Sequence, residues 1–478
     1  MDKIAERMPV SVSWYGLRRR ATDHHLAIEL IETAKLASPM VLTHLGQIAM
    51  MTTDLALIGR LGAEAVAAAA LAGRVYSIGI AFGVGLLAVT ATLAAQAFGS
   101  ENPGLIRRLL RMGLWAALLL SLPIMLVALH GEKILLALGQ GPDAARLGQQ
   151  YLFGLAWGVA PALCFLALRS FMGAVNRPKS AFWITLAAIP VNALLVYLLT
   201  YGKLGVPRLE LFGAGLATTL VNFATFFAGL WLATMCRPFR DYHILAHLWR
   251  FDWPSMQQII VLGTPISIAF LIEYGLSSAA ALLAGLIGTA ALAAHQIAFQ
   301  VSAILFMIPT GISMAAAVRV AHALGRNDGP GVKRAGLAAI LLGAVSVAIL
   351  TLAVVVARFE IAEFFLGEAG GDTDSTVKLA ARLLLVGASS FVAAAVYSIA
   401  AGTLRGLKDT RLPLLLSIVA YWPIGFSLSY LLGLEVGLGA IGIWIGLSIG
   451  RTVCATLLVL RFHLLASRLG FQSRYMAS

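Results

Sequence analysis

GTPISIAFLIEYGLSSAAALLAGLIG, from Gly263 to Gly288, is an apolar stretch of the length that an α-helix needs to cross a bilayer. It contains a single acidic or basic residue, Glu273. A carboxylate in the middle of a spanning helix costs about 2.5 to 3.5 kcal/mol on insertion scales, so it rarely occurs there without a partner or a function. The stretch therefore predicts a membrane helix and marks Glu273 as a candidate functional residue.

The rest of the chain is similarly apolar. Hydrophobic residues make up 60% of its 478 residues and charged residues 12%, and the mean hydropathy of +0.88 is typical of an integral membrane protein. The net charge of +13 comes from short basic clusters between apolar runs, so we expect a lipid bilayer and no nucleic acid as partner. Three widely spaced cysteines predict neither a disulfide framework nor a metal site. The first 34 residues are polar and unlike a cleavable signal peptide.

Apolar runs of about 20 residues occur twelve times, which predicts twelve membrane helices. Of the 35 Lys and Arg residues, 25 fall on one side of these runs and 9 on the other, with Arg451 inside the last run. By the positive-inside rule, both termini are expected in the cytoplasm, as in a multi-pass protein of the bacterial inner membrane. The predicted helices cover residues 35–59, 71–97, 109–129, 151–174, 180–201, 211–235, 258–286, 292–320, 335–357, 379–402, 412–432 and 439–462.

The two halves of the chain resemble each other, because a shift of 226 residues, and later of 233, aligns glycines and prolines. The aligned pairs include Pro39 with Pro265, Gly99 with Gly325, and Pro190 with Pro423. Six helices per half is an even number, so both halves enter the bilayer from the same side. They should be related by a pseudo-two-fold axis along the membrane normal, with a cavity between them.

The predicted fold is therefore an all-α polytopic membrane protein with two six-helix lobes. Its expected parts are a cytoplasmic N-terminal tail (1–34), an N-lobe (35–235), a cytoplasmic linker (236–255), a C-lobe (256–465) and a cytoplasmic C-terminal tail (466–478).

Two of the 22 acidic residues lie inside predicted helices and away from their ends, namely Asp54 and Glu273. The shift of 226 takes Asp54 to position 280, which is two helical turns from Glu273 on the same face. This favours one polar site in each half over the alternative that each carboxylate merely forms a hydrogen bond with a neighbouring helix, because a carboxylate in a membrane helix is costly. Such a carboxylate can carry a proton or supply charge to a bound sodium ion, and the pattern leaves both open.

Other polar residues in the predicted helices could accompany these carboxylates. Asn192 follows Pro190, which frees a backbone carbonyl, so its amide could stabilise the helix or coordinate an ion. Thr218 could bond its own preceding turn. His44 could serve as an interhelical hydrogen-bond partner or as a proton relay. Arg451 could pair with a carboxylate of the second half or extend toward the membrane surface.

Four stretches carry a family resemblance: LASPMVLTHLGQIAMMTTDLALIGRLGAEAVAA (Leu36–Ala68), GTPISIAFLIEYGL (Gly263–Leu276), AAHQIAFQVSAILFMIPTGISMAAAVRVAHALG (Ala293–Gly325) and AAGTLRGLKDT (Ala400–Thr410). They resemble multidrug and toxic compound extrusion (MATE) transporters, in particular the NorM-like bacterial branch. The resemblance covers residues 30–465. It implies a two-lobed, twelve-helix antiporter that exports organic cations and other amphipathic drugs in exchange for protons or sodium ions.

The resemblance also implies roles for single residues. Asp54 is similar to the family's first-helix aspartate in an N-lobe cation site. Asn192 and Thr218 resemble its partners on the fifth and sixth helices. Glu273 is similar to the seventh-helix glutamate of a C-lobe site. These four residues form the implied cation- or proton-coupling set, and the two carboxylates would also bind substrate in the cavity between the lobes.

The chain departs from the family pattern at two positions. Ala394 stands where an aspartate is usual in the tenth helix, and Val196 replaces a second asparagine in the fifth. Arg451 adds a positive charge to the half that lacks the carboxylate. Because sodium needs several oxygen ligands and negative charge, these departures favour a proton as the coupling ion. His295 and Gln296, in the matched eighth helix, are interpreted as structural.

The expected function is efflux of lipophilic or cationic drugs by a monomeric secondary antiporter that uses no cofactor. The alternative is a lipid-linked oligosaccharide flippase, because such proteins resemble this fold. A flippase would need several arginines in its cavity, and only Arg451 is expected at membrane depth. No P-loop, nucleophile or metal-ligand pattern indicates an enzyme or an ATP-driven pump.

Overall fold

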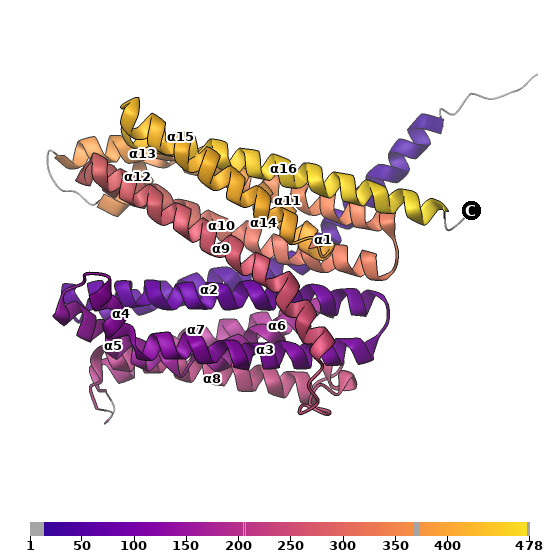
Figure 1. Ribbon diagram of the computed structural model, residues 1–478, viewed down its shortest axis with the longest axis horizontal. Helices are drawn as coiled ribbons and strands as arrows, with labels where there is room; N and C mark the ends of the chain where they lie inside the picture. The colour runs from indigo at the N-terminus through magenta and orange to yellow at the C-terminus, as the bar shows by residue number, and fades with distance from the viewer. Residues whose placement is uncertain (1–13, 204, 206, 367–371, 476–478) are drawn as a thin grey trace, which may run out of the picture.

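The computed structural model describes residues 14–203, 205, 207–366 and 372–475, and almost all of them are helical (Figure 1). In order along the described chain, the elements are α1 (Trp14–Gly59), α2 (Ala63–Gly99), α3 (Pro103–Leu129), α4 (Gly131–Ala137), α5 (Pro142–Ala156), α6 (Val159–Ala174), α7 (Pro178–Tyr201), α8 (Glu210–Met235), the 3₁₀ turn η1 (Phe239–Tyr242), α9 (Trp253–Ile287), α10 (Thr289–Gly325), α11 (Gly329–Val356), α12 (Arg358–Leu366), α13 (Asp372–Gly406), α14 (Arg411–Val419), η2 (Ala420–Phe426), α15 (Ser427–Tyr430), η3 (Leu431–Glu435) and α16 (Gly439–Tyr475).

Eleven helices in the described part of the chain are long and apolar enough to cross a membrane. A twelfth span is formed by α5 and α6 together, which are bent by 47° at their junction. The junction contains Gly158, where a Cβ would lie 2.6 Å from the Thr219 hydroxyl of α8, so only glycine fits. The prediction of an all-α protein with twelve membrane helices is confirmed, and the fourth of these is bent.

The first and eleventh spans differ from simple apolar helices. α1 begins at Trp14, inside the segment that the sequence assigns to the N-terminal tail. The eleventh span contains the π-helical segments η2 and η3, and Pro423 lies within η2. Proline cannot donate the normal backbone hydrogen bond, and a wider π turn accommodates that loss. Pro190, its counterpart in the first half, lies in the regular helix α7.

The helices form two lobes that converge toward one end of the molecule (Figure 1). α9 runs diagonally from the first lobe into the second, and in its first half Ser267 donates a 2.7 Å hydrogen bond to the Phe82 carbonyl of α2. α1 crosses in the opposite sense. Its middle turns contact α10, at Glu29 and Val41, and its last turns contact α7, where Asn192 donates to Asp54. Each lobe therefore includes a helix that also packs against the other lobe.

Close contacts between the lobes come in pairs related by the 226-residue shift. A side chain at Gly99 of α2 would collide with the His322 carbonyl of α10, and one at Gly325 would collide with the Gln96 carbonyl. The shift makes Gly99 equivalent to Gly325 and Gln96 equivalent to His322. The lobes thus present the same surface to each other, as a two-fold axis requires.

A second pair of contacts between the lobes is also related by the 226-residue shift. A Cβ at Gly85 would lie 2.6 Å from the Cα of Ser267, and one at the equivalent Gly311 would lie 2.7 Å from the Cα of Val41. α2 and α10 each contain 37 residues, and their bounds differ by 226 at both ends. The predicted pseudo-two-fold relation between the halves is confirmed.

The helices that follow α2 and α10 start at equivalent caps. The Asn102 side chain accepts a 3.0 Å hydrogen bond from the Leu105 amide at the start of α3. The Asp328 side chain accepts a 2.8 Å hydrogen bond from the Gly331 amide at the start of α11. Each cap satisfies an amide that a helix start leaves free, so the repeat extends to the turns between helices.

The interface between the lobes is filled mostly by small side chains. Alanines allow the helix backbones to approach closely, as is usual between membrane helices. This cluster lies toward the end of the molecule that holds the start of α1 and the C-terminus (Figure 1). Its buried members are Leu36, Ala37, Met40, Ala94, Ala95, Ala174, Ile312, Ala315, Ala316, Val318, Ala321, Ala339 and Ile399. The lobes are therefore joined at this end, which we call the terminal end.

Candidate functional site

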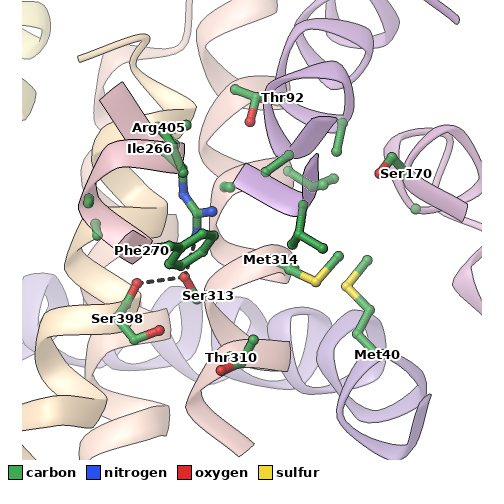
Figure 2. Close-up of a pocket in the computed structure, with 18 of the residues that line it drawn as sticks. Met40, Thr92, Ser170, Ile266, Phe270, Thr310, Ser313, Met314, Ser398 and Arg405 are labelled. Carbon is green, nitrogen blue, oxygen red and sulfur yellow. Dashed lines mark hydrogen bonds between the residues drawn. The ribbon is translucent and has the colours of Figure 1, made fainter. Parts of the chain in front are cut away.

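A cavity of about 160 Å³ lies between the two lobes (Figure 2). Helices α1, α2, α6 and α7 line it from the first lobe, and α9, α10, α13 and α14 line it from the second. Much of its wall is apolar and includes Met40, Ile266, Phe270 and Met314. Such a surface suits the apolar body of a small organic molecule, with a few polar groups to orient it.

Glu273 of α9 is one of the polar side chains that line this cavity. Its carboxylate accepts no hydrogen bond from the part of the chain that the structure describes, although its backbone carbonyl accepts one from Ser277. The charged group that acts on it electrostatically is the Arg451 guanidinium. The carboxylate is therefore available to a ligand in the cavity.

Arg451 lies inside the C-lobe, with 7% of the residue exposed. Its Nη1 donates a 2.7 Å hydrogen bond to the hydroxyl of Ser390 on α13, which is itself fully buried. Arg451 thus stays inside the second half and does not extend toward the membrane surface, but its hydrogen-bond partner is a neutral hydroxyl and not the carboxylate that the sequence suggested. Arg451 thus supplies positive charge close to Glu273 without forming a direct ion pair with it.

The position of the missing tenth-helix carboxylate lies in the same region. Ala394 is 6% exposed and sits on α13 one turn after Ser390 and one turn before Tyr397. Tyr397 lines the cavity and is within electrostatic reach of Glu273. In this region the family pattern would place two carboxylates. The second half of this chain instead combines the Glu273 carboxylate and the Arg451 guanidinium with the hydroxyls of Tyr397 and Ser390.

In the first half, Asp54 of α1 accepts a hydrogen bond from the side-chain amide of Asn192 on α7. Asn192 is fully buried, and its Oδ1 has no hydrogen-bond partner in the described chain. Tyr151 of α5 is within electrostatic reach of the same carboxylate. Asp54 is not among the side chains that line the cavity between the lobes. It belongs to a polar group inside the N-lobe.

Two other residues considered around Asp54 form no hydrogen bond with it in the described chain. The Thr218 hydroxyl donates a 3.3 Å hydrogen bond to the Ala214 carbonyl in its own helix. Val196 is fully buried in an apolar cluster formed with α1, α2 and α8. Of the sequence candidates, the structure brings Asp54 and Asn192 together and leaves Thr218 outside their hydrogen bond.

The histidines occupy different surroundings. His44 lines the cavity, with its Nε2 3.2 Å from the Met314 sulfur across the lobe interface. His295 is buried in the C-lobe and accepts a 3.2 Å hydrogen bond from the Trp444 indole, while Gln296 is exposed. The bond to Trp444 agrees with a structural interpretation of His295.

Two arginines that the sequence places near helix ends also line the cavity. Arg169 lies on α6 and Arg405 on α13. Arg405 donates a 2.8 Å hydrogen bond to Ser313, whose hydroxyl donates in turn to the Ser398 carbonyl at 2.6 Å (Figure 2). Arg169 lies five residues before the end of α6, and Arg405 lies one residue before the end of α13. A basic residue at such a position indicates membrane topology alone, so the sequence predicted neither as a cavity residue.

The model of the MatE family matches residues 39–198 and 265–431, which is more than half of the chain. The chain therefore belongs to the MatE family of membrane transporters, and the resemblance seen in its sequence is confirmed. It is 58% identical to a probable multidrug resistance protein NorM of Bradyrhizobium diazoefficiens, over 94% of this chain and 96% of that one. It is 53% identical to a protein of the same name from Rhodopseudomonas palustris, over 91% and 92%.

Solved structures share the fold at low sequence identity. The eukaryotic MATE transporter AtDTX14 superposes with a TM-score of 0.84 at 18% identity, over 95% of this chain and all of that one. A multidrug resistance MATE family transporter in an outward-facing conformation gives a TM-score of 0.83 at 20% identity, over 92% and 97%. These similarities confirm the two-lobed MATE fold of this multi-pass membrane protein.

Proposed function

We propose that this protein is a secondary antiporter of the bacterial inner membrane that exports amphipathic organic compounds carrying a cationic group in exchange for protons. The observation that carries the proposal is Glu273, a carboxylate without a hydrogen-bond partner in the described chain, facing a largely apolar cavity between two pseudo-symmetric lobes. Relatives 58% and 53% identical that are named multidrug resistance proteins support the export of drugs.

Exchange would follow from competition at one carboxylate. In a cavity of low dielectric constant, an ionised Glu273 attracts a cationic cargo strongly, and a proton on the carboxylate removes most of that attraction. The two ligands therefore weaken each other's binding, and this reciprocal coupling is what an antiporter needs. Glu273 would bind cargo and proton alternately.

The surroundings of Glu273 favour a proton over sodium. Sodium binds several oxygen ligands and is stabilised by negative charge. Here Ala394 offers no oxygen, and Arg451 places a positive charge near the one carboxylate. A proton needs only the carboxylate itself. We assign Asp54 to a second proton-carrying site in the N-lobe, where its partly buried carboxylate accepts a hydrogen bond from Asn192.

The packing of the lobes supports an assignment of the conformational state. The lobes are joined at the terminal end and diverge toward the other end (Figure 1). With cytoplasmic termini, as the basic residues predict, the cavity would be closed to the cytoplasm in this state. Transport would require the contacts at the terminal end to separate and reform.

Everted membrane vesicles with an imposed pH gradient test this function. Uptake of a fluorescent lipophilic cation should depend on the gradient and fall at least tenfold in Glu273→Gln, with a smaller loss in Asp54→Asn. Glu360→Gln is the matched control, because Glu360 is exposed on α12. Unchanged uptake in both carboxylate variants would exclude the proposed role of these residues, and uptake driven only by a sodium gradient would exclude proton coupling.

A second candidate function is a flippase for lipid-linked oligosaccharides, and the observation in its favour is the presence of Arg169 and Arg405 in the cavity. Titration of the purified protein with a lipid pyrophosphate and, separately, with a fluorescent lipophilic cation distinguishes the two candidates. Tight binding of the pyrophosphate alone would favour the flippase.

A further inference from the structure

We propose that the linker (236–255) lies in the membrane surface and binds anionic phospholipids of the surrounding bilayer. The sequence predicts a cytoplasmic connection between the lobes in this segment. In the structure the connection follows α3, and part of it extends beside the apolar part of that helix. The inference does not depend on the cargo or on the coupling ion proposed above.

The linker is attached to the beginning of α3 by hydrogen bonds to its backbone. Nε of Arg107 donates to the Tyr242 carbonyl at 2.8 Å, and Nη1 of Arg111 donates to the His247 carbonyl at 3.0 Å. Residues four apart lie on one face of a helix, so both arginines lie on the same side of α3. The linker therefore follows this face of α3 and does not extend away from the lobe.

A third hydrogen bond lies further along α3. Nε1 of Trp115 donates to the Leu248 carbonyl at 3.0 Å. Trp115 comes eight residues after Arg107, which is about 12 Å along a helix, and it belongs to the apolar run 109–129. Figure 1 shows the linker beside α3, set back from the turn that joins α2 and α3. The linker thus reaches the level where α3 changes from basic to apolar, and such a change marks the surface of a bilayer.

The linker has a buried face and an exposed face. Phe239 and Ile244 are each 2% exposed, and the Phe239 ring packs against Phe171 of α6 with 5.8 Å between centroids. Trp249 in contrast is 90% exposed, and Leu245 is 43% exposed. The first lobe therefore covers one set of apolar side chains and leaves the other set to the surroundings of the protein.

Aromatic side chains at the end of the linker extend this exposed face. Phe251 stacks on Trp253 with 6.2 Å between ring centroids and contacts the ring of Trp115 edge-on at 6.1 Å. Phe251 and Trp253 are both exposed. Contact with water is unfavourable for such rings, whereas tryptophan is enriched at membrane surfaces, where its apolar body and its N–H group are both accommodated. The exposed face is therefore suited to the headgroup region of a bilayer.

Arginines next to these aromatic side chains select for anionic lipid. Arg250 is exposed and acts electrostatically on Arg111, as do Arg107 and Arg108. The acidic side chain that acts on this cluster within the described chain is Asp252. Four arginines and one aspartate leave a surplus of positive charge. Phosphate groups form charge-assisted hydrogen bonds with arginine, and basic residues at a membrane surface attract anionic lipids.

The contacts that hold the linker belong to the first lobe. In the described chain η1 contacts α3 and α8, and the Asp252 amide donates a 3.3 Å hydrogen bond to the Met112 sulfur of α3. The linker would therefore move with the first lobe when the lobes separate. A phospholipid bound to the linker would hold this lobe at a fixed depth while the second lobe rearranges as a rigid body.

A fluorophore at position 249 tests the location of the linker. Trp249→Cys is combined with Cys236→Ser, labelled with an NBD group and reconstituted in phosphatidylcholine nanodiscs, while Cys164 and Cys454 are buried. We expect a lipid with a doxyl group near the top of its acyl chain to quench the fluorophore. Quenching by aqueous iodide should be weaker, by at least about threefold, than at a control position in water.

Glu101→Cys, on the same background, provides this control, because Glu101 is exposed in the turn between α2 and α3. Its fluorophore should be quenched by iodide and hardly by the doxyl lipid. If the fluorophore at position 249 behaves like the one at position 101, the linker lies in water, where a soluble partner could reach it, and the proposal is overturned.

The preference for anionic lipid is measured with the same fluorophore at position 249. The doxyl group is placed either on phosphatidylglycerol or on phosphatidylcholine, at equal mole fractions of the two lipids. Quenching by the phosphatidylglycerol should be stronger by about threefold, and Arg250→Gln should bring the ratio close to one. Arg250→Lys keeps the charge and should keep most of the preference, which separates the loss of charge from a misfolded linker.

Arg326→Gln is the matched control, because Arg326 is exposed just after the end of α10 in the other lobe. It should leave the ratio of quenching by the two lipids unchanged. Equal quenching by the two lipids around the unaltered Arg250, or the same ratio in Arg250→Gln as in Arg326→Gln, would overturn the binding of anionic lipid by the linker.

Discussion

Gly99 of α2 lies directly against the backbone carbonyl of His322 of α10, with no room for a side chain between the lobes. Gly325 and the Gln96 carbonyl repeat this contact about the pseudo-two-fold axis. Replacement of either glycine by leucine should destabilise the state closed at the terminal end by roughly 1 to 3 kcal/mol, the usual cost of overpacking. Since the contacts are equivalent, both variants should lose uptake to a similar extent.

Gly73→Leu is the control for these variants, because Gly73 lies on the same helix as Gly99 and a Cβ there would meet no atom within 4 Å. Its uptake in everted vesicles should match the wild type. Normal uptake in Gly99→Leu and Gly325→Leu would show that this contact is not needed in the transport cycle.

An ion pair between Glu29 of α1 and Arg319 of α10 also joins the lobes at the terminal end, and both side chains are about 20% exposed. Arg319→Gln should favour opening at this end, because an ion pair with little exposure is screened less than a surface pair. A cysteine at Thr92, which lines the cavity, reports on this opening.

A membrane-impermeant maleimide should label Thr92→Cys several-fold faster in everted vesicles when Arg319→Gln is present. Cys236, which is partly exposed, is replaced by serine in all of these proteins, while Cys164 and Cys454 are buried. Glu29→Gln should have the same effect, and the double variant should add little to either. Equal labelling rates in all four proteins would argue against the ion pair as a determinant of closure.

The sequence predicts the membrane architecture well because the bilayer imposes it. A spanning helix needs about 20 apolar residues, so each crossing leaves a signal that does not depend on tertiary contacts. The repeated glycines are also visible in the sequence, as Gly99 and Gly325 show. The carbonyls that they contact are not, because the partner of a glycine is set by how two distant helices cross. The same holds for the bend at Gly158, where the chain approaches α8 closely.

The candidate site is harder to predict from the sequence than the membrane architecture is. Glu273 and Asp54 stand out through the cost of a carboxylate in a membrane helix, but their surroundings differ. Only the crossing of α9 between lobes brings Glu273 to the cavity, while the end of α1 turns Asp54 toward Asn192. The sequence did not predict that Arg169 and Arg405 line the cavity, because a basic residue near a helix end normally indicates only which side of the membrane it lies on. Their long side chains reach the cavity from that position.

Asn192 and Thr218 should differ in their effect on stability. Asn192→Leu removes the hydrogen bond to Asp54 and leaves the carboxylate without its partner, which typically costs about 1 to 3 kcal/mol. Thr218→Val removes only a bond to its own helix turn and should cost less than about 0.5 kcal/mol. Thermal unfolding of the purified proteins, followed by intrinsic fluorescence, checks this order. A larger shift of the Tm in Thr218→Val would contradict the arrangement around Asp54.

Ala394 and Arg451 offer a direct test of the choice of coupling ion. Ala394→Asp combined with Arg451→Ala would give the C-lobe two carboxylates and remove the competing positive charge, which is what a sodium ion needs. The double variant should gain thermal stability on addition of sodium chloride relative to choline chloride, by about 1.4 kcal/mol when sodium reaches ten times its Kd. The wild type should respond equally to both salts, since Arg451 already provides the positive charge near Glu273. Arg451→Ala alone should also fail to respond, because a single carboxylate supplies too few oxygen ligands. A sodium-specific stabilisation of the wild type would mean that the missing carboxylate does not decide the ion, and the preference for protons would have to be abandoned.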